Sequence, residues 1–143
     1  MNKSRNCIVI LEDNLDRLEI LRGIVESLPG NFELRHIDSV DGLRSLASNG
    51  FACVRLLSLD FSLDNSSASR PGTGMDAVQF LIKRGPVCPV IVHTASAGDS
   101  RKMASALTGK GWSVKQVSFG SRDRVEKWRA AAMTLLAVTD TKA

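Results

Sequence analysis

The chain has 143 residues, of which 43% are hydrophobic and 24% are charged, with 11 glycines and 4 prolines. This composition is typical of a globular protein and argues against collagen-like, linker-rich and disordered classes. The length is enough to bury one core, so we expect a single domain over residues 1–143, with its core from about residue 6 to residue 138.

Two further observations narrow the class of protein. No run of about 18 apolar residues is present, so the sequence predicts neither a membrane span nor a signal peptide. Three cysteines without a Cys-x-x-Cys pair disfavour a disulfide framework and a structural zinc site, and we therefore expect a cytoplasmic protein.

The net charge of +4 is unevenly distributed. Residues 1–76 carry 8 basic and 11 acidic groups, whereas residues 77–143 carry 11 basic and 4 acidic groups. A basic half can attract phosphates or nucleic acid. Its lysines and arginines, however, have the spacing of solvated helix faces, and the scattered aromatic residues form no series for stacking bases. These features disfavour duplex DNA as a partner.

The first half of the chain alternates apolar runs with helical periodicity. A continuous apolar run at 7–11 predicts a strand buried on both faces, and apolar residues spaced by three or four predict a helix over 15–28. A partly exposed strand at 32–37 and a short helix at 40–47 follow. The apolar segment at 54–59 predicts a third strand.

The second half repeats this alternation after a polar loop. The loop covers 61–73, and apolar residues on one side predict a helix over 74–84. The remaining expected elements are strands at 89–92 and 112–117 and helices at 101–107 and 123–138.

Five strand–helix units predict an α/β fold of the (βα)5 type, in which a five-stranded parallel sheet carries helices on both faces. With right-handed crossovers, the expected strand order is the flavodoxin-like order 2-1-3-4-5. In such folds ligands bind beyond the carboxyl ends of the strands, near the first and third strands. The residues at the strand ends are therefore the candidates for function.

Ionisable and hydroxyl side chains stand at several of these ends: Glu12, Asp13, Asp60, His93 and Thr94. The three carboxylates repel each other if they converge, so the site should hold a hard divalent cation or keep a proton. Oxygen ligands favour Mg²⁺ or Mn²⁺ over zinc. A simpler interpretation of each residue taken singly is that Asp13 caps a helix and Asp60 caps a turn, without binding a metal.

The segments IVILEDN (Ile8–Asn14), GMD (Gly74–Asp76) and PVIVHTA (Pro89–Ala95) resemble the receiver domains of two-component response regulators. The resemblance extends over nearly the whole chain. It implies that a histidine kinase is the partner and that five residues have set roles. These are the metal-holding pair Glu12 and Asp13, the phosphoryl acceptor Asp60, the switch hydroxyl Thr94 and the phosphate-contacting Lys115. Two features depart from the receiver pattern, namely a longer loop at 61–73 and Gln116 in place of the usual proline.

A closer resemblance is to the cyclic-phosphate processing receiver domains. It rests on four segments: LEDN (11–14), LLSLD (56–60), GTGMDA (72–77) and PVIVHTAS (89–96). This resemblance implies a pocket that recognises or processes a nucleotide or RNA cyclic phosphate, so that the partner is a phosphate-containing small ligand or an RNA end. Phe61 and Ser62 stand where the group usually carries a further His and Asp.

On this hypothesis Glu12, Asp13 and Asp60 bind the cation, and His93 acts as an acid or base. The turn at Thr73-Gly74 receives phosphate oxygens. Simpler interpretations stand beside these, since a strand histidine can be a hydrogen-bonded core group and a Thr-Gly pair can be a plain helix start. Arg70 is expected to point into solvent.

Two other functions stay open at this point. One is a stand-alone response-regulator receiver that is phosphorylated on Asp60 and signals through a changed surface. The other is a degenerate receiver that serves only protein contact.

Overall fold

The computed structural model describes residues 6–63 and 72–141, and Arg70 lies outside them. Strands and helices alternate along these residues. The strands are β1 (Cys7–Leu11), β2 (Glu33–Ile37), β3 (Val54–Leu59), β4 (Val90–Val92) and β5 (Val114–Gln116). The helices are α1 (Leu15–Ser27), α2 (Val40–Ala47), α3 (Gly74–Arg84), α4 (Ala97–Thr108) and α5 (Arg124–Thr141). None of the helices in the described ranges is long and apolar enough to span a bilayer.

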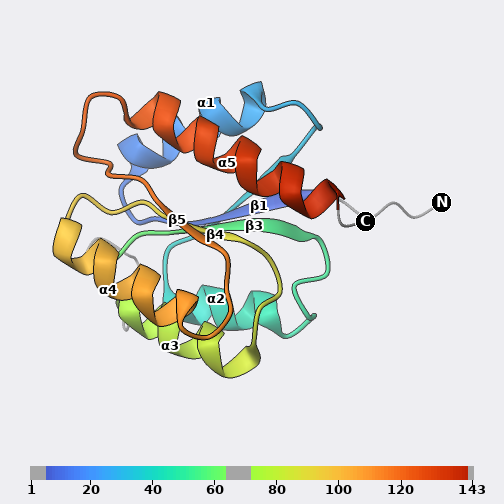
Figure 1. The fold of residues 1–143 in the computed structure, drawn as a ribbon, viewed down its shortest axis with the longest axis vertical. Coiled ribbons are helices and arrows are strands. Elements are labelled where there is room, and N and C mark those ends of the chain that lie inside the picture. The colour runs from blue at the N-terminus through green and yellow to red at the C-terminus, as the bar shows by residue number, and fades with distance from the viewer. Residues whose placement is uncertain (1–5, 64–71, 142–143) are drawn as a thin grey trace.

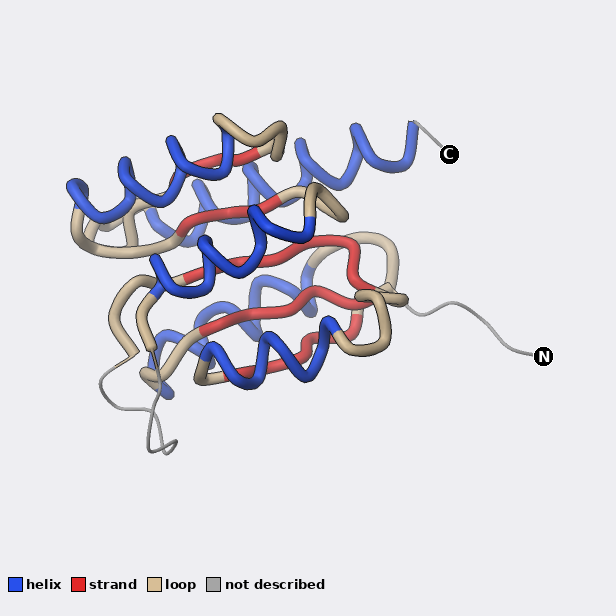
Figure 2. Tube along the Cα trace, turned by 90° about the horizontal axis from the view of Figure 1, so that it is seen from below, coloured by secondary structure: helices blue, strands red, loops and turns tan. Residues whose placement is uncertain are grey.

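The strands form one parallel sheet in the order β2-β1-β3-β4-β5, which confirms the predicted fold and strand order. Helices α1 and α5 cover one face of the sheet, and α2, α3 and α4 cover the other (Figure 1). Seen from below, the strands run side by side, and the axes of the helices lie roughly along the strands (Figure 2). All five strands therefore point their carboxyl ends at the same edge.

Two apolar clusters, one on each face of the sheet, explain the continuous apolar runs of the strands. In β1, Val9 and Leu11 pack with the α2–α4 side, whereas Ile8 and Ile10 pack with the α1–α5 side. Alternate side chains of one strand point to opposite faces, so a strand covered on both faces must be apolar at every position.

The predicted element bounds differ from the structure most at α4. Its first turn was expected at residue 101, but the helix begins at Ala97 because the Ser96 side chain accepts the Asp99 N–H at 3.3 Å. This polar first turn carries no apolar periodicity, so only the cap marks its start.

The start of α3 lies directly against the end of β3. Thr73 caps the helix in a capping box with Asp76, and the Gly74 N–H donates to the Phe61 carbonyl at 2.7 Å. A Cβ at Gly74 would lie 2.5 Å from the Asp60 carbonyl oxygen and 2.6 Å from Cα of Phe61. Glycine is therefore the residue that lets α3 approach the backbone of Asp60 and Phe61.

We expect Gly74→Ala to lower the free energy of unfolding by about 1–3 kcal/mol, because the backbone atoms that its methyl group would meet cannot move independently. The control is Gly23→Ala in α1, where an added Cβ meets nothing within 4 Å. That change should leave stability equal or raise it by up to about 1 kcal/mol, since alanine is the better helix former. Urea unfolding of both variants measures this, and equal effects would contradict the close packing of α3.

Candidate metal centre

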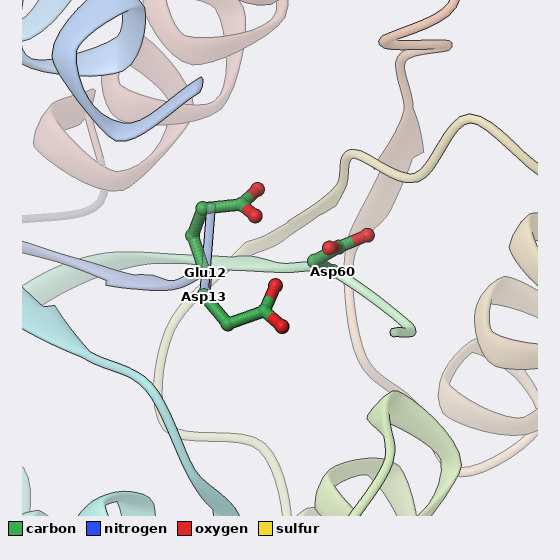
Figure 3. Close-up of side chains that lie close together, drawn as sticks. All are labelled: Glu12, Asp13 and Asp60. Atoms are coloured by element: carbon green, nitrogen blue, oxygen red, sulfur yellow. The ribbon is translucent and has the colours of Figure 1, made fainter. Parts of the chain in front are cut away.

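Three carboxylates meet where the central strands end. Glu12 and Asp13 follow β1, and Asp60 follows β3 (Figure 3). The two strands pair directly, with Leu11 level with Leu59 and the Asp60 N–H donating to the Leu11 carbonyl at 3.1 Å. One oxygen from each carboxylate lies within 4.8 Å of the others, and the three residues are at most 9% exposed. The predicted convergence is therefore confirmed.

Asp60 is the carboxylate with the least support from its neighbours. Its Oδ1 accepts the Phe61 N–H at 2.8 Å, but its buried Oδ2 has no hydrogen-bond partner and faces Nη2 of Arg17 at 3.6 Å. Burial raises the pKa of Asp60 to about 6, and the charge of Glu12 adds to this, although His93, Arg17 and the Phe61 N–H act in the opposite direction. One oxygen of Asp60 thus remains available to a ligand.

Glu12 has partners at both oxygens. His93 Nε2 donates to Oε1 at 2.9 Å, the Asn14 N–H donates to Oε2 at 3.0 Å, and Nε of Arg17 lies 3.4 Å from Oε2. Burial alone would raise the pKa of Glu12, but the His93 hydrogen bond and these other partners hold it below its ordinary value. Glu12 is therefore held in its ionised form.

Arg17 is the member of this cluster that the sequence reasoning missed. It lies in the first turn of α1, where the Asn14 side chain caps the helix by accepting the Arg17 N–H at 3.0 Å. Its guanidinium contacts both Glu12 and Asp60. A cation in the first turn opposes the helix dipole, so its position was a signal that an anionic partner lies nearby.

His93 is fully buried and forms part of the core. Its Nε2 faces Glu12, its Nδ1 lies 2.6 Å from Ser58 Oγ, and its ring packs edge-on against Phe119. A general acid or base must reach the ligand. Both ring nitrogens are engaged by side chains instead, so the geometry favours the core interpretation of His93, and its expected role as an acid or base stays a prediction.

The second histidine, His36 on β2, reaches the same edge, and the sequence analysis did not select it. Its Nε2 donates to the main-chain carbonyl of Glu12 at 2.7 Å. This bond holds the backbone of Glu12 from the side opposite β3. The signal was available, because β2 was predicted to lie beside β1, so its last residues had to reach this edge.

Thr94, Thr73 and Gly74 lie around the carboxylates in different ways. Thr94 follows β4, the neighbour of β3, and its Oγ1 accepts the Ser96 N–H at 3.4 Å. Thr73 and Gly74 form the start of α3 beside Asp60, where the Thr73 hydroxyl serves as the helix cap. The expected helix start is thus present at the correct edge of the sheet.

Lys115 is not brought to this cluster. It lies within β5, level with Ile91 in the middle of β4, and it lines a surface depression with Lys127 and Thr134 of α5. At the level where β4 ends, the N–H of Val117 donates to the Val92 carbonyl at 2.9 Å. The register places the lysine one residue before the end of β5, so it does not favour the expected phosphate contact of Lys115, which stays a prediction.

The residues present fit a hard divalent cation. Glu12 and Asp60 both face the guanidinium of Arg17, and no hydrogen bond engages the buried Oδ2 of Asp60, which leaves an oxygen donor for a cation. Carboxylate oxygens without sulfur or imidazole ligands are the donor set that Mg²⁺ and Mn²⁺ prefer. Glu12, Asp13 and Asp60 are the residues that would hold such an ion.

Comparison with known families gives one match, and it covers most of the chain. The model of the family described as Cyclic-phosphate processing Receiver domain matches residues 8–109. Among curated proteins, no relative of this chain is found at significant similarity.

Solved structures of response regulators share the fold at low sequence identity. A CheY-like receiver domain protein from Methanospirillum hungatei has a TM-score of 0.71 at 16% identity and covers 98% of this chain and 100% of its own. The phosphorylated cyanobacterial phytochrome response regulator RcpA has a TM-score of 0.72 at 12% identity, and the match covers 94% of this chain and 96% of RcpA. The Mn²⁺-bound form of response regulator Rcp1 has a TM-score of 0.63 at 17% identity, and the match covers 87% of this chain and 90% of Rcp1.

The raised pKa of Asp60 predicts how stability depends on pH when divalent cations are removed by a chelator. Because the folded state binds this proton more tightly, the stabilisation is complete below pH 3.8 and is lost as the pH rises through about 6. The difference between these pKa values corresponds to about 3 kcal/mol. Asp60→Asn, which is neutral at every pH, should therefore be more stable than wild type by up to this amount at pH 8.

Urea unfolding at pH 4, 6 and 8 tests this expectation, and the advantage of Asp60→Asn should disappear near pH 4. Asp41→Asn makes the same chemical change on an exposed carboxylate of α2 and should show no such trend. A wild type that is more stable than Asp60→Asn at pH 8 would show that the Asp60 carboxylate is not electrostatically strained.

Proposed function

Because the chain belongs to the cyclic-phosphate processing receiver domain family, we propose that its acidic cluster binds Mg²⁺ or Mn²⁺ and, with that ion, a nucleotide or RNA cyclic phosphate. The observation that carries this proposal is the buried Oδ2 of Asp60, which has no hydrogen-bond partner. A buried carboxylate oxygen without a hydrogen bond is incompletely compensated by an ion pair at 3.6 Å, and a cation bound to it would supply the missing interaction.

The three carboxylates have different tasks in this proposal. Glu12 is the fixed ligand, since its orientation is set by His93 and by the Asn14 N–H. Asp60 is the ligand with the open oxygen, and Asp13 completes the set from the end of β1. A bound divalent cation would offset the repulsion among the three carboxylates and polarise a phosphoryl oxygen.

The surroundings of Asp60 support an anionic ligand beside the cation. The start of α3 packs against the backbone of Asp60 and Phe61, and the positive end of a helix dipole favours a phosphate group. Thr73 and Gly74 therefore stay in the proposal as the phosphate side of the site, with Thr94 at the adjacent strand end. The Gly74 N–H donates to the Phe61 carbonyl and the capping box with Asp76 closes the helix start, so a phosphate here would have to compete with these contacts. His93 enters it as the support of Glu12 and transfers no proton to the ligand.

Cation binding should raise the thermal stability of the wild type, because the ion binds the folded state. At a cation concentration of a hundred times Kd the gain is about 2.7 kcal/mol. Asp60→Asn should lose the shift, and the matched exposed control Asp41→Asn should retain it. A melting temperature of the wild type that does not change with millimolar Mg²⁺ or Mn²⁺ would refute the metal site.

The same samples then test the phosphate ligand by calorimetry. We expect 2′,3′-cyclic AMP to bind the wild type in the presence of Mn²⁺ and to bind more weakly after chelation, whereas Asp60→Asn should not bind it. The ring-opened 3′-monophosphate measures whether the cyclic form is preferred. Absence of binding across cyclic nucleotides and RNA ends would remove this ligand class and leave only the cation site.

A second candidate function is phosphorylation of Asp60 by a histidine kinase. It is supported by the Asp60 oxygen that has no hydrogen bond and by Thr94, which follows the neighbouring strand β4. We rank it second because Lys115, the residue expected to stabilise an aspartyl phosphate, lies within β5 and away from the strand end.

Incubation with acetyl phosphate and Mg²⁺ distinguishes the two functions. We expect little or no gain of mass on the intact protein, because the cluster lacks the lysine contact. A mass increase of one phosphoryl group on the wild type, absent from Asp60→Asn, would place the signalling function first.

A further inference from the structure

A line of buried hydrogen bonds connects helix α5 to the acidic cluster. The Trp128 indole N–H donates to Ser58 Oγ at 3.0 Å, Ser58 Oγ lies 2.6 Å from His93 Nδ1, and His93 Nε2 donates to Glu12 Oε1 at 2.9 Å. All four side chains are fully buried. The line passes from α5 through β3 and the end of β4 to the end of β1, so it crosses the centre of the sheet.

The chemistry of the four groups gives the line one direction. An indole N–H can only donate, so Ser58 Oγ accepts from Trp128. The ionised carboxylate of Glu12 can only accept, so His93 Nε2 carries the proton of that bond. With a neutral imidazole, the Ser58 hydroxyl proton is then directed at Nδ1 of His93. Every donor has an acceptor, and the series ends at one oxygen of Glu12.

This line of hydrogen bonds is buried among apolar side chains. Ile10, Leu56 and Phe119 belong to the same core cluster as Trp128. Burying a serine hydroxyl and an imidazole among such side chains is unfavourable unless both are paired, and apolar residues would fill the space without that requirement. The polar groups are explained by the carboxylate at the end of the line.

We propose that Ser58 and Trp128 are positioning residues of the cation site, which act through His93 to hold the Glu12 carboxylate in its metal-binding orientation. The inference rests on the proposed function, since it requires that Glu12 is a ligand. Outer residues of this kind orient a ligand group and set its affinity without touching the ion. The line also makes the affinity of the site depend on how α5 packs against the sheet (Figure 1).

Ser58→Ala tests the positioning role, because it removes the hydroxyl and leaves the packing almost unchanged. We expect Mn²⁺ to bind this variant about 10- to 100-fold more weakly than the wild type, measured by calorimetry on the full chain. The control is Leu136→Ala, which removes an apolar side chain of α5 that belongs to the same core cluster and takes part in none of the three hydrogen bonds of the line. This control should lose stability and keep the Kd of the wild type.

The indole N–H of Trp128 supplies a second readout that a merely structural role would not move. The chain has two tryptophans, and Trp112 lies in the cluster on the other face of the sheet. Titration with Mg²⁺ should shift the indole N–H resonance of Trp128 and leave that of Trp112 in place, with Trp112→Phe assigning the two signals. In Ser58→Ala the metal should no longer shift the Trp128 signal.

Each outcome decides between the two claims. If the wild type binds no cation, the proposed function fails and the positioning role fails with it. If the wild type binds Mn²⁺ and Ser58→Ala binds it equally well, the site stands and the positioning role is overturned. A loss of Mn²⁺ affinity in Leu136→Ala as large as that in Ser58→Ala also overturns the positioning role, because lost stability then explains the weaker binding of both variants. Should Ser58→Ala not fold, the response of the Trp128 resonance in the wild type decides alone.

Discussion

Burial of three carboxylates at one edge of the sheet is the constraint around which the other groups of the site are arranged. Glu12, Asp13 and Asp60 repel one another, and burial weakens the solvation that would otherwise reduce this repulsion. Neighbouring groups compensate for this repulsion to different extents at Glu12 and at Asp60. Glu12 receives hydrogen bonds at both oxygens, whereas Asp60 receives one at Oδ1 and shares the charge of Arg17. Two neighbouring carboxylates therefore differ in pKa and in freedom, which separates a fixed ligand from an open one.

The fold could be predicted because its signals are local and repeated. A strand buried on both faces must be apolar throughout, as in β1, and each helix of the alternation places apolar residues on the sheet. The positions of Glu12, Asp13 and Asp60 followed from the same pattern, since carboxyl ends of adjacent parallel strands meet at one edge. Residue order along the chain was sufficient for these three.

What could not be predicted depends on side-chain direction and register. His93 ends an apolar strand, and nothing in its neighbours along the chain shows that its ring turns inward to Ser58 and Glu12. The role of Lys115 was implied by the resemblance to receiver domains. Because β5 is short and partly exposed, its apolar content does not define its register against β4. Arg17 comes from a helix, and its contact with Asp60 exists only once α1 has folded against the sheet.

The position of Lys115 has a different consequence, which concerns the two borders of the sheet. The border strands β2 and β5 each have one neighbour, so each presents main-chain groups to which a foreign strand could add. Lys115 is exposed on β5, and β2 carries Glu33 and Arg35, whose charged groups lie 4.0 Å apart. Charged side chains along a free border disfavour the addition of another strand, because their solvation would be lost. A lysine that contributes nothing to the acidic cluster thus helps to keep copies of this chain from joining sheet to sheet.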